Sequence, residues 1–288
     1  IELPNKKLKS LKDYKNYIII GDSFAQGAGV DYDKSFSGII SSKFNKKGFN
    51  IINLSAVSYS PSIYYTKLKY FIENYDLKFS KIIIFLDISD PYDELYRYKI
   101  KNDKVVNRKR ETNPFITNNK EQLIYYLKKI ISNNTTIIYF VSNLIYDFPY
   151  PKKTDEFTEN YGFIINHQAN YWTYNNKYFE KEGYLGVELC KKYIDKIFKL
   201  MKQVNINSDL TIVIYPWPGQ IFRDDKNALQ RDIWKNWTQK NNVNFLDLSD
   251  LFFNDESTEK ERIEIIDRYF LKKDMHLNTN GHNLVSKE

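Results

Sequence analysis

Short apolar runs alternate with amphipathic stretches along the first 90 residues of the chain. Residues 17–20, 50–54 and 81–90 form the runs, and the last of them shows no polar alternation. Such runs are typical of strands buried on both faces of a parallel sheet. Between them, residues 34–48 and 60–75 place apolar side chains at helical spacing. The pattern predicts three β-α units wound right-handedly into a parallel sheet.

The β-α rhythm stops at about residue 91 and returns at about residue 210. Residues 91–209 are charged, Asn-rich and aromatic around helical segments, and we interpret them as an insertion or cap. Further strands are predicted at 210–220 and 243–252, with a helix between them and another at the end of the chain. We therefore expect a single domain over residues 1–288, an α/β fold of three layers (α/β/α) with about five parallel strands. The insertion would lie between strands 3 and 4.

Charge and cysteine content narrow the classes of function. The net charge of +7 comes from 43 basic and 36 acidic residues spread along the chain. Without dense basic runs we expect a solvated surface and no nucleic-acid partner, although a polyanionic glycan or an anionic membrane face stays open. Cys190, the one cysteine, excludes an intramolecular disulfide. We expect a monomer, with membrane attachment at most through a segment beyond these residues.

The segment "IIIGDSFAQGAGV" (18–30) places Ser23 directly after the first apolar run. Gly-Asp-Ser suits a turn or a helix cap, so Ser23 is either a turn residue or a nucleophile. The carboxyl ends of parallel strands are where α/β proteins place their chemistry, which favours the second interpretation. The glycines fit no phosphate loop, since no Lys-Ser/Thr follows, and no dinucleotide fingerprint, since the third glycine is missing.

A serine nucleophile needs a base that removes its proton. The three histidines of the sequence are His167, His276 and His282. His276 stands in "KKDMHLN", two residues after Asp274 and just before the last predicted helix, where it can reach across the strand ends. We expect a packing or surface role for His282 and a structural role for His167.

Taken in order, these motifs resemble the SGNH, or GDSL-like, hydrolase superfamily. The Gly-Asp-Ser segment matches its first block, with Ser23 in the nucleophile's place. "DMHLNTNGH" is similar to its last block, although Asp-x-x-His is shortened here to Asp274-x-His276, as in related polysaccharide acyltransferase domains. The resemblance implies a flavodoxin-like SGNH fold, a triad of Ser23, His276 and Asp274, and no cofactor or metal.

The two middle blocks of the family are altered. "NLSAVSYSP" has Ser58 where the family has a glycine, and Gly-x-Asn-Asp becomes "DISD" (87–90), with Ser89 in place of the asparagine. The resemblance implies an oxyanion hole made of the backbone N–H groups of Ser23 and Ser58 and the Ser89 hydroxyl. Loop acids in this segment more often cap helices or pair with lysines than bind a cation.

An acyl-enzyme on Ser23 can be resolved by water, as in an esterase, or by a sugar hydroxyl, as in an O-acyltransferase such as an acetyltransferase. Trp172 and Trp217 would suit stacking on a carbohydrate ring, or they pack the protein's own core. We also expect Asp22 and Asp90 to contact substrate.

The altered blocks favour the branch of the family that acts on acylated surface polysaccharides, and hence a bacterial cell envelope or periplasmic location. The alternative is a catalytically degenerate SGNH scaffold that binds glycan or a pathway partner, and reactivity of Ser23 separates the two.

Overall fold

The computed structural model describes residues 11–102, 104–107 and 155–288. The chain divides into two compact units, one formed by residues 1–107 and 160–288 and the other by residues 108–159. The sheet and the candidate site belong to the first unit. Residues 108–154 of the predicted insertion lie outside the described residues.

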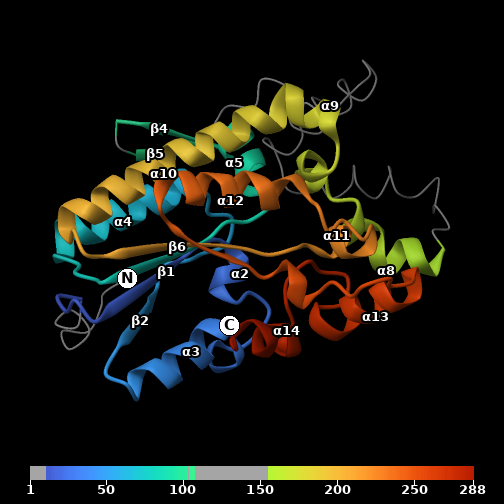
Figure 1. Ribbon diagram of the computed structural model, residues 1–288, viewed down its shortest axis with the longest axis horizontal. Coiled ribbons are helices and arrows are strands. Elements are labelled where there is room, and N and C mark those ends of the chain that lie inside the picture. The colour runs from blue at the N-terminus through green and yellow to red at the C-terminus, as the bar shows by residue number, and fades with distance from the viewer. Residues whose placement is uncertain (1–10, 103, 108–154) are drawn as a thin grey trace, which may run out of the picture. The chain divides into compact units, whose positions relative to one another are not determined.

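A parallel five-stranded sheet forms the centre of the first unit (Figure 1). Its strand order is β2-β1-β3-β6-β7, and a separate antiparallel hairpin pairs β4 with β5. This order brings the carboxyl ends of β1, β3 and β6 together in the middle of one sheet edge. The strands are β1 (Asn16–Ile20), β2 (Asn50–Asn53), β3 (Lys81–Phe85), β4 (Tyr98–Lys101), β5 (Lys104–Asn107), β6 (Asp209–Ile214) and β7 (Asn244–Asp247).

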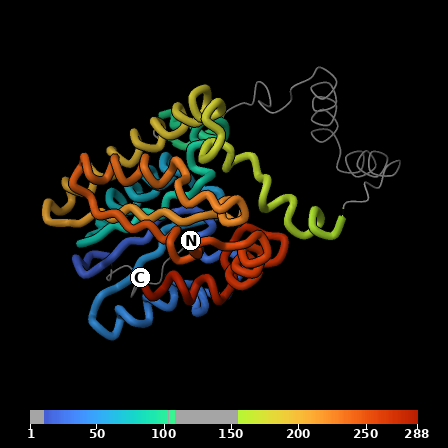
Figure 2. Tube along the Cα trace, turned by 45° about the vertical axis from the view of Figure 1, so that its right-hand side comes forward, coloured from blue at the N-terminus to red at the C-terminus, as the bar shows by residue number. Residues whose placement is uncertain are grey.

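Helices cover both faces of the sheet, with α4, α10 and α12 on one side and α3 and α14 on the other (Figures 1 and 2). The helices are α2 (Ser23–Gln26), α3 (Phe36–Asn45), α4 (Pro61–Tyr75), α5 (Asp90–Tyr96), α8 (Glu156–Ile165), α9 (Asn176–Tyr178), α10 (Tyr184–Val204), α11 (Pro218–Phe222), α12 (Leu229–Asn241), α13 (Glu259–Tyr269) and α14 (Thr279–Val285). Short turns of 3-10 or π helix add Tyr32–Lys34, Gln168–Thr173, Phe179–Gly183 and Ser249–Leu251.

The two faces of the strands point into two separate apolar cores. Ile18 and Ile20 of β1 belong to the core beneath α4 and α10, whereas Ile19 belongs to the core on the opposite face. Ile82 of β3 belongs to the first of these cores, and Val213 of β6 belongs to the second. Because successive side chains of a strand point to opposite faces, an unbroken apolar run is what a sheet covered on both sides requires.

Two predicted strands end earlier in the structure than in the sequence pattern. The run at 81–90 leaves the sheet after Phe85, and the run at 210–220 leaves it after Ile214. Leu86 and Ile88 stay buried as loop residues, so the apolar pattern continues although the strand does not. Beyond β6, Pro216 and Pro218 lack the N–H that a strand ladder needs. The pattern also left the helix α13 and the β4–β5 hairpin unpredicted.

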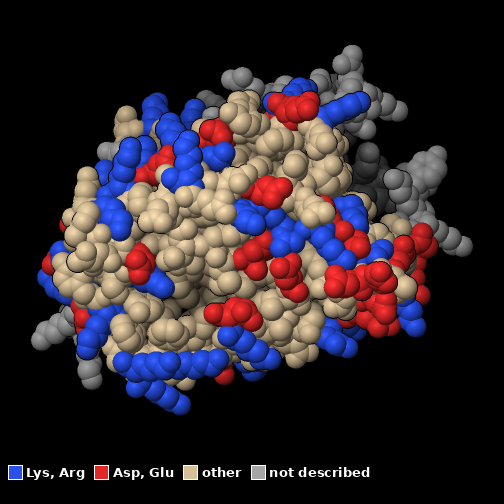
Figure 3. Space-filling model, viewed as in Figure 1, with Lys and Arg blue, Asp and Glu red and all other residues tan. Residues whose placement is uncertain are grey.

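The face shown in Figure 3 carries charges of both signs, with acidic side chains gathered over α13. The sequence of α13 contains Glu259, Glu261 and Glu264. No helix among the described residues is both long enough and apolar enough to cross a membrane.

Candidate active site

Ser23 is the first residue of α2 and follows β1 after two residues. Gly21 allows this tight passage, because a Cβ there would lie 2.7 Å from the Ala25 Cβ and 3.0 Å from the Phe85 carbonyl oxygen. Asp22 caps the short helix by accepting the backbone N–H of Phe24 at 3.0 Å. The local sequence therefore holds Ser23 at the carboxyl end of a central strand, where the residue is 8% exposed.

His276 and Asp274 reach this serine from the loop between α13 and α14. The loop turns sharply, with Lys273 in the left-handed region (φ 58°) and the Leu271 N–H bonded to the His276 carbonyl. Oδ1 of Asp274 accepts the backbone N–H of His276 at 3.1 Å and lies 2.6 Å from Nδ1 of its ring. This turn allows the two side chains to meet although a single residue separates them.

The structure brings the three predicted triad residues into one continuous line. Nε2 of His276 is 2.8 Å from Oγ of Ser23, and Nδ1 faces Asp274. A neutral imidazole that donates Nδ1–H to Asp274 leaves Nε2 free to accept the serine proton. The ring of Phe24 lies against the imidazole, with the ring centroids 4.9 Å apart. Such an arrangement can activate a hydroxyl for attack on an acyl carbonyl.

The residues predicted for the oxyanion hole lie in the loops after β1, β2 and β3. Ser58 adopts the left-handed conformation (φ 60°), which explains why a glycine suits this position in the family that the sequence resembles. Within the described part of the chain, the backbone N–H groups of Ser23 and Ser58 make no hydrogen bond, and neither does the Ser89 hydroxyl. The backbone N–H of Ser89 is engaged by Asp87 at 2.7 Å, so the hydroxyl is the donor that Ser89 can offer.

Asp22 and Asp90, predicted to contact substrate, are instead buried within the protein, at 4% and 0% exposure. Asp90 accepts the Tyr64 hydroxyl at 3.0 Å and the backbone N–H of Asp87 at 3.0 Å. Burial raises the pKa of both Asp22 and Asp90 well above the usual range, and the nearby Asp87 raises each further. Hydrogen-bond partners inside the fold therefore occupy both carboxyl groups, and contact of either group with substrate stays a prediction.

Tyr215 and Asp87 connect this buried cluster, and the sequence analysis assigned neither a role in the site. The Tyr215 hydroxyl lies 2.9 Å from Oδ2 of Asp87 and 3.3 Å from Oδ1 of Asp22. Tyr215 directly follows β6 and Asp87 follows β3, so both stand at the sheet edge that carries Ser23. A polar residue within two positions of the end of each central strand was the available signal.

The predicted stacking tryptophans are buried as well. Trp172 is 1% exposed and donates its indole N–H to the Ile88 carbonyl at 2.8 Å. Trp217 is 2% exposed and donates to Oδ2 of Asp87 at 2.8 Å. Of the two interpretations that the sequence left open, core packing is the one the structure supports, since neither indole face can receive a sugar ring.

The other two histidines pack against aromatic rings and accept backbone N–H groups. His167 lies edge-on to Trp217, with ring centroids 5.3 Å apart, and its Nδ1 accepts the Ala169 N–H. His282 is 1% exposed on α14, and its Nδ1 accepts the Phe36 N–H at 3.3 Å. Burial, together with the nearby His276, lowers the pKa of His282 to about 4.

His282 is expected to make the protein sensitive to acid. Between pH 6.5 and about 4, the unfolded chain binds a proton at this residue that the folded protein excludes, so the free energy of unfolding falls as the pH falls. His282→Asn keeps an acceptor for the Phe36 N–H but cannot titrate. The loss of stability between pH 7 and 4 should be smaller in the variant by up to ~3 kcal/mol, measured by urea unfolding. Parallel pH curves for the two proteins would contradict this.

No group of three or more His, Cys, Asp or Glu side chains is placed to hold a metal ion in the described residues. The acidic residues after Asp90 have protein partners: Asp93 pairs with Arg97 at 3.1 Å, and Glu94 accepts the Ser60 hydroxyl at 2.6 Å. The Asp93–Arg97 pair lies at the end of α5, and Glu94 connects α5 to the start of α4.

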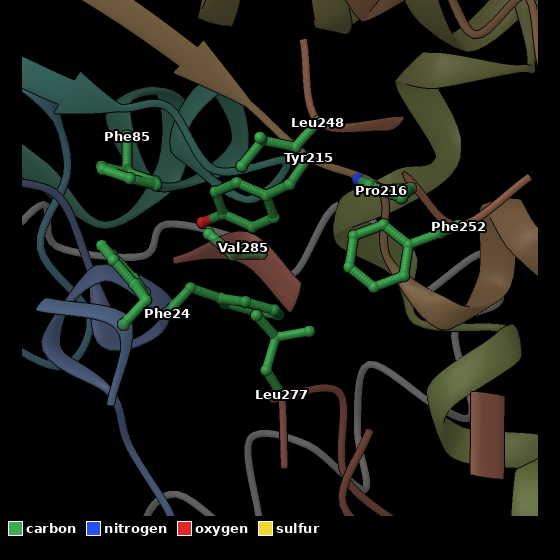
Figure 4. Close-up of a pocket in the computed structure, with 9 residues that line it drawn as sticks. Phe24, Phe85, Tyr215, Pro216, Leu248, Phe252, Leu277 and Val285 are labelled. Atoms are coloured by element: carbon green, nitrogen blue, oxygen red, sulfur yellow. The ribbon is translucent and has the colours of Figure 1, made fainter. Parts of the chain in front are cut away.

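A small apolar cavity of about 10 Å³ is lined by nine residues (Figure 4). Phe24 and Leu277, the chain neighbours of Ser23 and His276, form part of its wall. At this size it holds at most about one water molecule, so it is a packing gap and has no room for an acyl chain. The other lining residues are Phe36, Phe85, Tyr215, Pro216, Leu248, Phe252 and Val285.

Neither a protein-family model nor a curated protein matches the sequence. Among solved structures, a lipolytic G-D-S-L family protein from Veillonella parvula is 11% identical, with a TM-score of 0.47 over 94% of both chains. The esterase EstA from Pseudoalteromonas sp. is 9% identical, with a TM-score of 0.43 over 95% of this chain and 93% of that chain. The acetyl xylan esterase AlAXEase is 12% identical, with a TM-score of 0.50 over 94% of this chain and 96% of that chain. The chain has the SGNH hydrolase fold.

The SGNH fold accounts for where the candidate site lies. The prediction of a three-layer α/β/α architecture with about five parallel strands is confirmed. In this chain the strand β1 delivers Ser23, and the loop before α14 delivers His276 and Asp274. The loops after β2 and β3 carry Ser58 and Ser89.

Proposed function

We propose that the chain is a serine esterase or O-acyltransferase that acts on an acylated carbohydrate through an acyl-enzyme on Ser23. The observation that supports it most is the unbroken line from Ser23 through His276 to Asp274, with heavy-atom distances of 2.8 and 2.6 Å. Both distances are in hydrogen-bond range, as proton transfer from the serine requires.

The reaction begins when Oγ of Ser23 attacks the acyl carbonyl carbon and its proton passes to Nε2 of His276. Asp274 holds the imidazole in the required tautomer and stabilises the imidazolium. When the tetrahedral intermediate collapses, His276 returns the proton to the departing alcohol, and the acyl group stays on Ser23. A water molecule or a sugar hydroxyl then gives its proton to His276 and takes the acyl group.

The negative charge that forms on the acyl oxygen needs donors that the resting protein does not use. The backbone N–H groups of Ser23 and Ser58 and the hydroxyl of Ser89 meet this condition in the described part of the chain. We assign them to the oxyanion hole. Donors fixed in place before the reaction stabilise a developing oxyanion without reorganising.

A carbohydrate ester is the substrate class we propose. It is supported by the likeness in fold to an acetyl xylan esterase, whose substrate is an acetylated glycan. On this protein's own surface, Tyr174 is 38% exposed and the Arg223 guanidinium lies 3.9 Å from its ring centroid. A partly exposed aromatic ring suits contact with a sugar. Trp172 and Trp217 are buried and take no part in the proposed sugar contact.

The test is intact-mass spectrometry after exposure to a fluorophosphonate and, separately, to p-nitrophenyl acetate. Wild type and the control Ser42→Ala, at an exposed position of α3, should each gain one adduct, whereas Ser23→Ala should gain none. Acetylated xylan with and without a free xylo-oligosaccharide acceptor then separates release of acetate from its transfer. Absence of any adduct on the wild type would favour the glycan-binding scaffold instead.

A further inference from the structure

Ser23 has two hydrogen-bonding neighbours and a single proton to share. Its Oγ lies 2.8 Å from Nε2 of His276 and 3.3 Å from Oδ2 of Asp22. Because the imidazole proton points from Nδ1 to Asp274, Nε2 is an acceptor and takes the serine proton. With the serine proton directed at Nε2, the contact between Ser23 Oγ and Asp22 Oδ2 is a hydrogen bond only when the carboxyl group supplies the hydrogen.

Asp22 also has few donors around it to stabilise a second buried anion. Tyr215 lies between Asp22 and Asp87 but has one phenolic proton. Asp87 is the nearer of the two, at 2.9 Å, and also accepts the Trp217 indole N–H and the Ser89 backbone N–H. These three groups donate to Asp87. At Asp22, Oδ1 accepts the backbone N–H of Phe24, so the oxygen left to carry a proton is Oδ2.

We propose that Asp22 is a neutral carboxylic acid whose Oδ2–H donates a hydrogen bond to Oγ of Ser23, which makes it a further catalytic residue. The proposal rests on the function proposed above. The donated bond holds the serine hydroxyl with its own proton toward His276. It also opposes the negative charge that gathers on Oγ as that proton leaves, while the Asp22 proton itself stays in place.

The groups around Asp22 favour its neutral form. It is buried, it faces Asp87 and the hydroxyls of Ser23 and Tyr215, and the next acids in the cluster are Asp90 and Asp93. The Tyr64 hydroxyl completes the cluster through Asp90. Desolvation raises the pKa of Asp22, and repulsion from Asp87 raises it further. No lysine or arginine is hydrogen-bonded to Asp22 among the described residues.

This role predicts a particular pH dependence. When the pH rises through the raised pKa, Asp22 ionises and becomes an acceptor that competes with His276 for the serine proton, so acylation slows on the alkaline side. Asp22→Asn cannot ionise, and its amide N–H can replace the acid O–H while Oδ1 still caps α2. It should acylate within about tenfold of wild type near neutral pH and lack that alkaline decline, whereas Asp22→Ala should lose on the order of 10²-fold.

Two measurements on the whole chain test this assignment. The wild-type minus Asp22→Asn infrared difference spectrum should show the carbonyl band of a protonated carboxylic acid, shifted in D₂O. The matched control Asp31→Asn removes an exposed aspartate paired with Lys34 and should show a carboxylate band instead. Rates of fluorophosphonate labelling of Ser23 against pH provide the second readout for the three Asp22 proteins.

The outcomes separate this proposal from the proposed function. A protonated-acid band together with loss of the alkaline decline in Asp22→Asn would support a neutral donor. A carboxylate band at Asp22, or an Asn variant as slow as the Ala variant, would overturn it even if wild type labels normally. If wild type is not labelled at all, the proposed function fails, and the infrared band still reports the protonation of Asp22 independently.

Discussion

Ser23→Ala and His276→Ala are each expected to abolish turnover of acyl esters while leaving the fold intact. The first removes the atom that forms the acyl-enzyme, and the second removes the base 2.8 Å away that takes its proton. Because the two act as one unit, either change should lower kcat by roughly 10⁶-fold, and combining them should add little. Hydrolysis of p-nitrophenyl acetate measures the loss, and circular dichroism and thermal unfolding check the fold.

Ser42→Ala serves as the control for this pair, since Ser42 lies exposed on α3 and should retain full activity. A Ser23→Ala protein as active as wild type would exclude the acyl-enzyme at this residue. A His276→Ala protein with wild-type activity would place the base elsewhere.

Asp274→Asn should have the second largest effect, smaller than that of His276→Ala. The Asn side chain can present an N–H to Nδ1 of His276, which favours the tautomer that carries its proton on Nε2 and can no longer accept one from Ser23. We expect kcat to fall by roughly 10⁴-fold, about 100 times less than for loss of the base. The Asp274 side chain is 47% exposed, so water can take over part of its role.

The measurement is kcat for p-nitrophenyl acetate across the pH range where wild type is active. Asp255→Asn, at an exposed position, is the control and should match wild type. A wild-type rate in Asp274→Asn would mean that another group orients His276.

The sequence predicted the sheet well because its strands are buried on both faces. The isoleucines of β1 and β3 leave no polar alternation, and a surface strand would show one. Ser23 and His276 could be predicted as nucleophile and base from the sequence, because a serine just after a strand and a histidine just before a helix are local features. Those features also implied the fold, and the fold brings Oγ of Ser23 to 2.8 Å from Nε2 of His276.

The surroundings of the nucleophile could not be predicted in the same way. Asp22, Asp87 and Tyr215 follow three different strand segments, and the pattern of apolar residues does not say which polar groups meet where those segments end. Trp172 and Trp217 were ambiguous for a related reason, since an indole has a large apolar face and one N–H that fit a core and a binding surface equally. In this protein, buried acceptors at Ile88 and Asp87 take up those N–H groups.

The hydrogen bond between Ser23 and His276 joins residues 253 positions apart in the sequence. This bond forms only when β1 in the middle of the sheet and the loop before α14 are both in place, so neither part can build the site without the other. Loops open at a lower free-energy cost than central strands. Catalytic turnover therefore requires both the sheet and this loop to be folded. On gentle heating, turnover should be lost before the circular dichroism signal of the sheet changes.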